Sequence, residues 1–226
     1  MTNPRPVVYI VDDEPGVRNS VSSLVRSVGL EVRTFAGGVE FLESKREDAA
    51  ECLVLDVRMP GISGLDLHNQ LLQSPFPIPV IFITGHGDIP LAVRLMKAGA
   101  LEFLTKPFHD QDLLAAIYRA IRRSSVARQR QVALAALRAR FASLTPREAA
   151  VMEGVVEGLL NKQIGAQSGT SEKTVKAHRA QVMRKMQAGS LPDLVRMAEW
   201  LSIPPHSRRS FTPEDSAASG SSQREQ

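Results

Sequence analysis

Five polar residues follow short apolar runs of the sequence and could together carry out phosphoryl chemistry. If the apolar runs are parallel strands, their carboxyl ends meet at one edge of a sheet, where ligands bind in such folds. Carboxylates brought together at that edge repel one another unless a hard cation shares them, and Mg²⁺ prefers carboxylate oxygens. The sequence therefore predicts a Mg²⁺-assisted phosphoryl site formed by Asp12, Asp13, Asp56, Thr84 and Lys106.

An aspartyl-phosphate mechanism accounts for the whole set. Asp56 is the predicted nucleophile, because it follows a central strand of the inferred sheet and a carboxylate can attack phosphorus in line. Mg²⁺ held by Asp13, Asp56 and the backbone carbonyl of Arg58 would balance one phosphoryl oxygen. The ammonium of Lys106 would balance a second oxygen, and the Thr84 hydroxyl with loop N–H groups would bind the third.

Short apolar runs alternate with segments of helical spacing in the first half of the chain. This alternation predicts a doubly wound α/β domain of five parallel strands and five helices, with helices on both faces of the sheet. One predicted helix ends at Gly29, Ser63 caps another, and Asp88 caps one that ends at Gly99. The predicted strands are Val7–Val11, Glu31–Phe35, Cys52–Leu55, Pro79–Ile83 and Leu101–Leu104.

The fifth helix begins near Asp110, and neither proline nor glycine follows until Pro146. Serines at 124 and 125 interrupt its apolar stripe, which resumes at Val132. The pattern allows one long helix that bridges two domains, or two helices with a break near Ser124.

The second half of the chain has only short helical segments. Thr145-Pro-Arg-Glu148 is typical of a capping box with proline at the first helical position. Further helices are predicted over Asn161–Gln167, from Ser171 to about Gln187, and over Leu191–Leu201, with a turn at Gly169. The predicted organisation is an α/β domain over residues 1–123, a helical linker over 124–142, an all-α helix-turn-helix domain over 143–203, and a disordered tail over 204–226.

Positive charge is concentrated in this second half. Residues 125–204 carry 12 lysines and arginines against 6 acidic residues, whereas residues 1–124 carry 13 against 15. The imbalance predicts a polyanionic partner for the second half alone. A glycine turn followed by a capped basic helix is the layout of a helix-turn-helix, which places its last helix in the major groove of DNA. The cationic face of that helix contains Lys173, Lys176, Ala177, Ala180 and Arg184.

Composition excludes several other classes of protein. Cys52 is the single cysteine, so the chain can form neither an intramolecular disulfide nor a multi-cysteine metal site, and its apolar neighbours predict a buried thiol. The sequence contains no signal-peptide core and no apolar run of the roughly 20 residues that cross a membrane. We therefore expect a soluble, cytoplasmic protein that does not bind membranes.

Four motifs of the first half resemble the receiver domain of bacterial two-component response regulators, over residues 6 to about 123. They are Val11-Asp-Asp-Glu14, Leu55-Asp-Val-Arg-Met-Pro-Gly61, Ile83-Thr-Gly-His86 and Ala98-Gly-Ala-Leu-Glu-Phe-Leu-Thr-Lys-Pro-Phe108.

The receiver resemblance implies a role for each of its polar positions. It makes Asp56 the phospho-acceptor and implies a cis peptide bond before Pro107. Phe103 would be the aromatic residue that turns inward on activation, where many family members carry tyrosine. The resemblance further implies Asp12 and Asp13 as the acidic metal pair, Thr84 as the switch hydroxyl and Lys106 as the phosphate-contacting lysine.

Three motifs of the second half resemble the LuxR-type helix-turn-helix, from about Ser143 to Leu201, so the whole chain resembles a response regulator of the FixJ/NarL type. They are Leu144-Thr-Pro-Arg-Glu148, Gly158-Leu-Leu-Asn-Lys-Gln-Ile164 and Ser171-Glu-Lys-Thr-Val-Lys-Ala-His-Arg179. By this resemblance the helix Leu191–Leu201 pairs subunits. The residues that would face bases are Thr174, Lys176, Ala177 and Ala180, and those that would lie on phosphates are Lys173, Arg179 and Arg184.

The two resemblances together imply a DNA-binding transcription regulator that a sensor histidine kinase phosphorylates on Asp56. The implied partners are that kinase, double-stranded promoter DNA and a second copy of the chain, which would dimerise on phosphorylation, and RNA polymerase is a candidate partner. The chain would not be an enzyme, apart from phosphorylation and dephosphorylation of its own receiver domain.

Three alternative functions fit the sequence less well. A phosphatase of the haloacid dehalogenase type needs a second carboxylate two residues after the nucleophile, whereas Val57 and Arg58 follow Asp56. A dinucleotide enzyme would carry GxGxxG after the first strand, and none is present. An RNA-binding antiterminator would lack the helix-turn-helix motifs, and comparing binding to duplex DNA and to RNA would distinguish it.

Overall fold

A computed structural model describes residues 5–74, 77–85 and 89–202 of the chain. Contacts divide the chain into two compact units, Met1–Gln131 and Val132–Gln226. Asp88, the predicted cap of one helix, and the tail from residue 204 onward lie outside the described residues.

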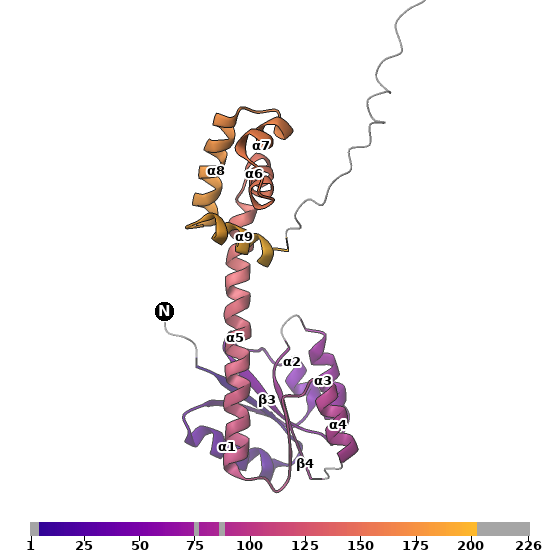
Figure 1. The fold of residues 1–226 in the computed structure, drawn as a ribbon. Coiled ribbons are helices and arrows are strands. Elements are labelled where there is room, and N and C mark those ends of the chain that lie inside the picture. Colours follow the sequence, from indigo (N-terminus) through magenta and orange to yellow (C-terminus); the bar gives the residue numbers. More distant parts are fainter. Residues whose placement is uncertain (1–4, 75–76, 86–88, 203–226) are drawn as a thin grey trace, which may run out of the picture. The chain divides into compact units, whose positions relative to one another are not determined.

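The first unit is built on a five-stranded parallel sheet with the order β2-β1-β3-β4-β5 (Figure 1). Strands β1 and β4 are buried along their whole length and β3 is buried from its second residue onward, because helices cover both faces of the sheet. This confirms the predicted doubly wound α/β fold. The strands are β1 Val7–Val11, β2 Glu31–Phe35, β3 Glu51–Asp56, β4 Val80–Thr84 and β5 Glu102–Thr105.

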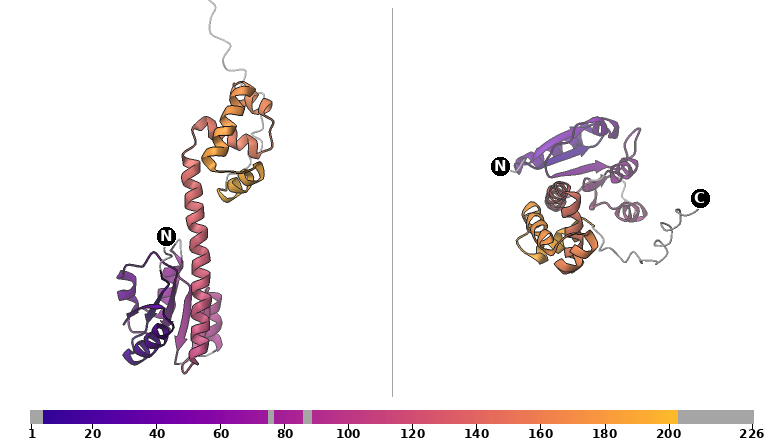
Figure 2. Two further views of the ribbon diagram at one scale, coloured as in Figure 1. Left: turned by 90° about the vertical axis from the view of Figure 1, so that its left-hand side faces the viewer. Right: turned by 90° about the horizontal axis from the view of Figure 1, so that it is seen from above.

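Two apolar cores lie on opposite faces of this sheet. Because side chains alternate along a strand, Val8 and Ile10 of β1 join one core while Tyr9 joins the other. The first core contains α1 Pro15–Ser27 and the start of α5 Asp110–Ala142, and the second contains α2 Gly38–Glu43, α3 Gly64–Leu72 and α4 Ile89–Lys97 (Figure 2). Cys52 of β3 is fully buried in the first core, as its apolar neighbours predicted.

Helix α5 continues without a break from Asp110 to Ala142, through the two serines that interrupt its apolar pattern. Ser124 Oγ accepts a hydrogen bond of 3.0 Å from the backbone N–H of Glu51, at the start of β3. One turn later, Arg128 forms an ion pair with Asp48. The serine therefore contributes a tertiary contact to the helix. The spacing of apolar residues does not predict such a contact.

Between residues 132 and 202 the second unit contains the end of α5 and four further helices around a separate apolar core. The Thr145 capping box is present, and Ser171 and Ser190 accept hydrogen bonds from the third residue of the helices that they precede. Gly169 has φ of +65°, a left-handed conformation that glycine adopts without strain and that ends α7. The helices are α6 Pro146–Val156, α7 Asn161–Ser168, α8 Glu172–Met186 and α9 Leu191–Trp200, which confirms the predicted all-α helix-turn-helix unit.

In the part of the chain that the structure describes, no helix is both long enough and apolar enough to cross a membrane.

Candidate functional site

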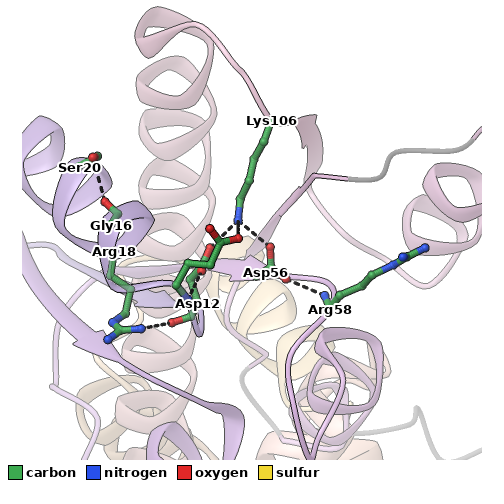
Figure 3. Close-up of polar contacts among 8 residues, drawn as sticks. Asp12, Gly16, Arg18, Ser20, Asp56, Arg58 and Lys106 are labelled. Carbon is green, nitrogen blue, oxygen red and sulfur yellow. Dashed lines mark hydrogen bonds and ion pairs between the residues drawn. The ribbon is translucent and has the colours of Figure 1, made fainter.

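Asp12, Asp56 and Lys106 meet at the carboxyl edge of the sheet (Figure 3). The ammonium Nζ of Lys106 donates to Asp12 Oδ2 at 2.8 Å and to Asp56 Oδ1 at 2.9 Å. Asp12 is fully buried, and the exposed fractions of the Asp56 and Lys106 side chains are 8% and 16%. The structure thus brings together three of the five residues that the sequence predicted to share one site.

Local backbone geometry holds the two carboxylates at this edge. Asp12 directly follows β1, and its Oδ1 accepts a hydrogen bond of 2.9 Å from the backbone N–H of Glu14, just before α1 begins. Asp56 is the last residue of β3, and its Oδ2 accepts one of 2.7 Å from the N–H of Arg58. Each carboxylate therefore has one oxygen fixed by the following loop and the other directed to Lys106.

Gly64, at the start of α3, allows that helix to approach the site. A Cβ atom on Gly64 would lie 2.2 Å from the backbone oxygen of Asp56, closer than any side chain permits. The side chain of Ser63 fixes the same helix start, because its Oγ accepts a hydrogen bond from the N–H of Asp66.

The electrostatics of the site follow from burial and from its single cation. Burial raises the pKa of Asp56, and the hydrogen bond from Lys106 only partly opposes that rise. Burial by itself lowers the pKa of Lys106, but hydrogen bonds to the two carboxylates outweigh it and leave that pKa raised. One ammonium thus faces two carboxylates, so the site can accept a further positive charge.

The donor set at this edge suits a hard divalent cation. Asp12 and Asp56 offer carboxylate oxygens that now face the Lys106 ammonium, and such oxygens are ligands that Mg²⁺ prefers. Asp13, the third predicted carboxylate, is exposed. Among the described residues no group of three or more acidic, histidine or cysteine side chains could hold a metal ion. The structure therefore assembles two of the three predicted carboxylates.

The two predicted switch residues lie on adjacent strands beside this cluster. Thr84 is buried at the end of β4, and its backbone oxygen accepts a hydrogen bond of 2.8 Å from the N–H of Lys106. Phe103 of β5 is half-buried and packs against the core that contains its register partner, Phe82. The peptide bond between Lys106 and Pro107 is cis, as the receiver resemblance implied.

Three residues that shape the site are not among those predicted from the sequence. Glu14 Oε1 lies 3.8 Å from Lys106 Nζ, and Arg18 Nη1 donates to the backbone oxygen of Asp12 at 2.6 Å. Gly64 is the third. Glu14 could have been suspected of lying at the site because it ends the motif Val11-Asp-Asp-Glu14. No feature of the sequence pointed to Arg18 or Gly64.

The predicted DNA-binding face of α8 is solvent-exposed. Val175, Val182 and Met186 of this helix are buried in the core of the second unit, so the opposite face is free to contact a partner. Six of the seven predicted contact residues are exposed, namely Lys173, Thr174, Lys176, Ala177, Ala180 and Arg184.

The remaining predicted contact, Arg179, is half-buried and already has a partner. Its Nη1 donates to Asn161 Oδ1 at 3.3 Å and so joins α8 to the first residue of α7. The sequence did not indicate this structural contact, because the two residues lie in different helices.

An ion pair anchors the far end of α8. Lys185 Nζ donates to Glu148 Oε2 at 2.6 Å and to the backbone oxygen of Ser143 at 3.0 Å, and Glu148 also accepts the N–H of Thr145. The hydrogen bond from Lys185, followed by the one from Thr145, lowers the pKa of Glu148 to about 2.

We expect this carboxylate to make the second unit sensitive to acid. The pKa of Glu148 is depressed in the folded state, so its stabilisation is present above the ordinary pKa of 4.5 and is lost as the pH falls toward about 2. Unfolding by denaturant, followed between pH 6 and pH 2 for wild type and Glu148→Gln, measures the effect. The variant should lose less stability than wild type over that interval, and parallel pH profiles would contradict the assignment.

Comparisons with known proteins agree with both units. Residues 8–118 match the response regulator receiver domain, and residues 142–198 match bacterial regulatory proteins of the luxR family. Nodulation protein W of Bradyrhizobium diazoefficiens is 51% identical over 199 residues, which are 88% of each chain. Transcriptional regulatory protein FixJ of the same organism is 44% identical over 84% of this chain and 93% of that protein. The solved structure of response regulator StyR is 46% identical, with a TM-score of 0.79 over 87% of this chain and 99% of that chain.

Proposed function

The chain belongs to the two-component response regulators with a LuxR-type DNA-binding domain, and we propose that phosphorylation of Asp56 by a sensor histidine kinase controls its dimerisation and promoter binding. Proteins of this family regulate transcription and are not enzymes. The observation that carries the proposal is the convergence of the buried Asp12 and Asp56 carboxylates on Lys106.

Each residue of the cluster has a defined part in the proposed reaction. An oxygen of the Asp56 carboxylate attacks phosphorus, the bond from phosphorus to the donor breaks, and the electron pair leaves with the donor. Lys106 already contacts Asp56 Oδ1 at 2.9 Å, so its ammonium can balance charge on a phosphoryl oxygen beside the new bond. The Thr84 hydroxyl with loop N–H groups binds another oxygen.

Asp12, Asp13 and Asp56, with the backbone oxygen of Arg58, are the proposed Mg²⁺ ligands. When bound, Mg²⁺ supplies positive charge that balances the phosphoryl oxygens during transfer. The support is the carboxylate pair at the sheet edge and its single ammonium. Asp13 follows Asp12 directly and is exposed, so it can enter the coordination sphere without unpacking the core.

The proposed switch links phosphorylated Asp56 to the outer strands. Phosphorylation adds negative charge and acceptor oxygens, toward which the Thr84 hydroxyl moves, and Phe103 then fills the vacated space. Coupling of this kind is typically worth about 1–3 kcal/mol, which is enough to favour a dimer.

The proposed output is two-site binding to promoter DNA by the helix-turn-helix domain, residues 143–203. Thr174, Lys176, Ala177 and Ala180 of α8 face bases, while Lys173, Arg179 and Arg184 lie on phosphates. Two linked domains bind far more tightly than one, and a two-fold dimer favours an inverted repeat.

Residues 1–123 form the receiver, 124–142 the linker and 204–226 a tail. The regulator acts in the cytoplasm, and RNA polymerase is a candidate partner.

One experiment tests this proposal. Molar mass by light scattering and duplex affinity are measured with and without beryllofluoride, a phosphoryl mimic, for wild type, Asp56→Asn and Thr84→Ala. We expect the mimic to raise the mass and the affinity of wild type, to leave Asp56→Asn unchanged, and to act weakly on Thr84→Ala. A wild type that does not respond, or an Asp56→Asn variant that responds fully, would rule the proposal out.

A further inference from the structure

A long segment centred on α5 carries only positive charge. Between Leu113 and Arg147 the chain contains eight arginines, with no lysine and no acidic residue, although the formal net charge of the whole protein is only +4. Helix α5 covers most of this segment and lies outside the helix-turn-helix. A purely basic stretch of this length needs a physical explanation beyond solubility, for which residues of mixed sign suffice.

Four of these arginines line one open cavity on the surface of α5. The cavity has a volume of about 420 Å³, and its other lining residues are Val126 and Ala127. The arginines follow one another at helical offsets of three, one and seven, so their side chains lie on neighbouring parts of one helix surface. The four are Arg119, Arg122, Arg123 and Arg130, which we call the arginine face.

Most of the arginine face has no partner within the described residues. Arg119 pairs with Glu102 at 2.6 Å, whereas Arg122, Arg123 and Arg130 are exposed and form no ion pair in the described ranges 5–74, 77–85 and 89–202. None of them contributes to the apolar core, which α5 enters through Leu113, Ala116, Ile117 and Ala120. Packing therefore does not account for these three side chains.

Like charges three or four residues apart, as Arg119 is from Arg122 and Arg123, destabilise a helix. A bound anion would reduce this repulsion. Arginine is also the side chain best suited to phosphate, because its planar guanidinium can donate two parallel hydrogen bonds to two oxygens. An open surface with four guanidinium groups fits a polymer of phosphates better than a single enclosed ligand.

We propose that the arginine face binds backbone phosphates of the same DNA duplex that α8 contacts, without reading its sequence. Fifteen residues separate Arg130 from Pro146, the first residue of α6 in the helix-turn-helix domain. When α8 binds a duplex, this short tether keeps the arginines at a high effective concentration near that duplex. The proposal rests on DNA binding by α8 and extends it to the first compact unit, to which residues 119–130 belong.

The test compares two variants of the full chain that lose the same charge. One carries Arg122→Gln, Arg123→Gln and Arg130→Gln. The control carries Arg5→Gln, Arg26→Gln and Lys45→Gln, which are exposed side chains of the same unit that form no ion pair with any described residue. Affinity for a random-sequence duplex of about 60 base pairs is measured against salt concentration, because each lost phosphate contact lowers the log–log slope by about 0.9.

We expect the arginine variant to lower the slope by about 2–3 units, which reduces the affinity lost between 50 and 200 mM salt by about 16- to 64-fold. The control should keep the wild-type slope. Equal slopes for wild type and the arginine variant would overturn the proposal. A fall in molar mass by light scattering with an unchanged slope would also overturn it, and would point to an acidic protein surface instead.

An Arg184→Ala variant of α8 separates failure of this proposal from failure of the function on which it rests. If α8 holds DNA, Arg184→Ala weakens binding and lowers the slope by about one unit. If Arg184→Ala and the arginine variant both bind as wild type does, DNA binding by α8 has failed and the proposal fails with it. If only the arginine variant binds as wild type does, the α5 contact alone is wrong.

Discussion

Replacement of Asp56 by asparagine is expected to abolish phosphorylation of the protein by a small phosphodonor in the presence of Mg²⁺. The amide is not a nucleophile toward phosphorus. Among the described carboxylates, Asp56 and Asp12 alone are nearly buried, contact Lys106 and also accept a loop N–H. Intact-mass measurement detects the added phosphate directly. Wild type should gain one phosphoryl group, and the variant should gain none.

Two further variants make this result specific. Asp112→Asn removes an exposed carboxylate in the first turn of α5 and should leave labelling unchanged. Asp12→Asn keeps the nucleophile but removes the carboxylate that shares Lys106 with it, so labelling should slow sharply. Undiminished phosphate on Asp56→Asn would show that the phospho-acceptor lies elsewhere.

Replacement of Lys106 by methionine is expected to destabilise the first unit by about 3 kcal/mol at neutral pH, because removing one partner of a buried ion pair leaves uncompensated charge. The variant retains an unbranched side chain that is one heavy atom shorter, and it loses the ammonium between Asp12 and Asp56. Unfolding by denaturant without divalent cations measures the loss. The deficit should shrink as the pH falls, since protonation of one carboxylate removes the repulsion.

A second substitution separates this electrostatic effect from lost packing. Lys106→Met combined with Asp12→Asn should recover at least about 1 kcal/mol of the deficit, because only one carboxylate then remains in the buried site. Lys97→Met, on an exposed side chain of α4 that forms no ion pair in the part of the chain that the structure describes, serves as the matched control and should be close to neutral. If the double variant is less stable than Lys106→Met, repulsion between the two carboxylates is not the cause.

Local patterns in the sequence determined most of the architecture. Alternating apolar runs predicted the five strands, and the capping box at Thr145 and the cap at Ser63 placed helix starts that the structure confirms. The rule that strand ends meet at one edge placed Asp12, Asp56 and Lys106 together before any distance was known. These predictions were correct because burial and capping act over a few neighbouring residues. Both therefore appear in the sequence as regular spacings of residue types.

Tertiary structure decided which of those residues touch. Asp12 and Asp13 are the same residue type at adjacent positions, yet the first is fully buried against Lys106 and the second is exposed. Ser124 weakens the helical pattern but accepts the N–H of Glu51, so α5 continues. Arg179 belongs to the basic helix but binds Asn161 of α7.

The physical reason is the sequence distance over which these contacts form. Lys106 lies 94 residues from Asp12 and 50 from Asp56, and the Ser124 contact spans 73. Local periodicity tells only whether a side chain points toward the core or toward solvent. The partner that it meets there depends on how strands and helices pack, so the sequence by itself determined the elements and the edge of the site, and the tertiary structure decided the ion pairs within it.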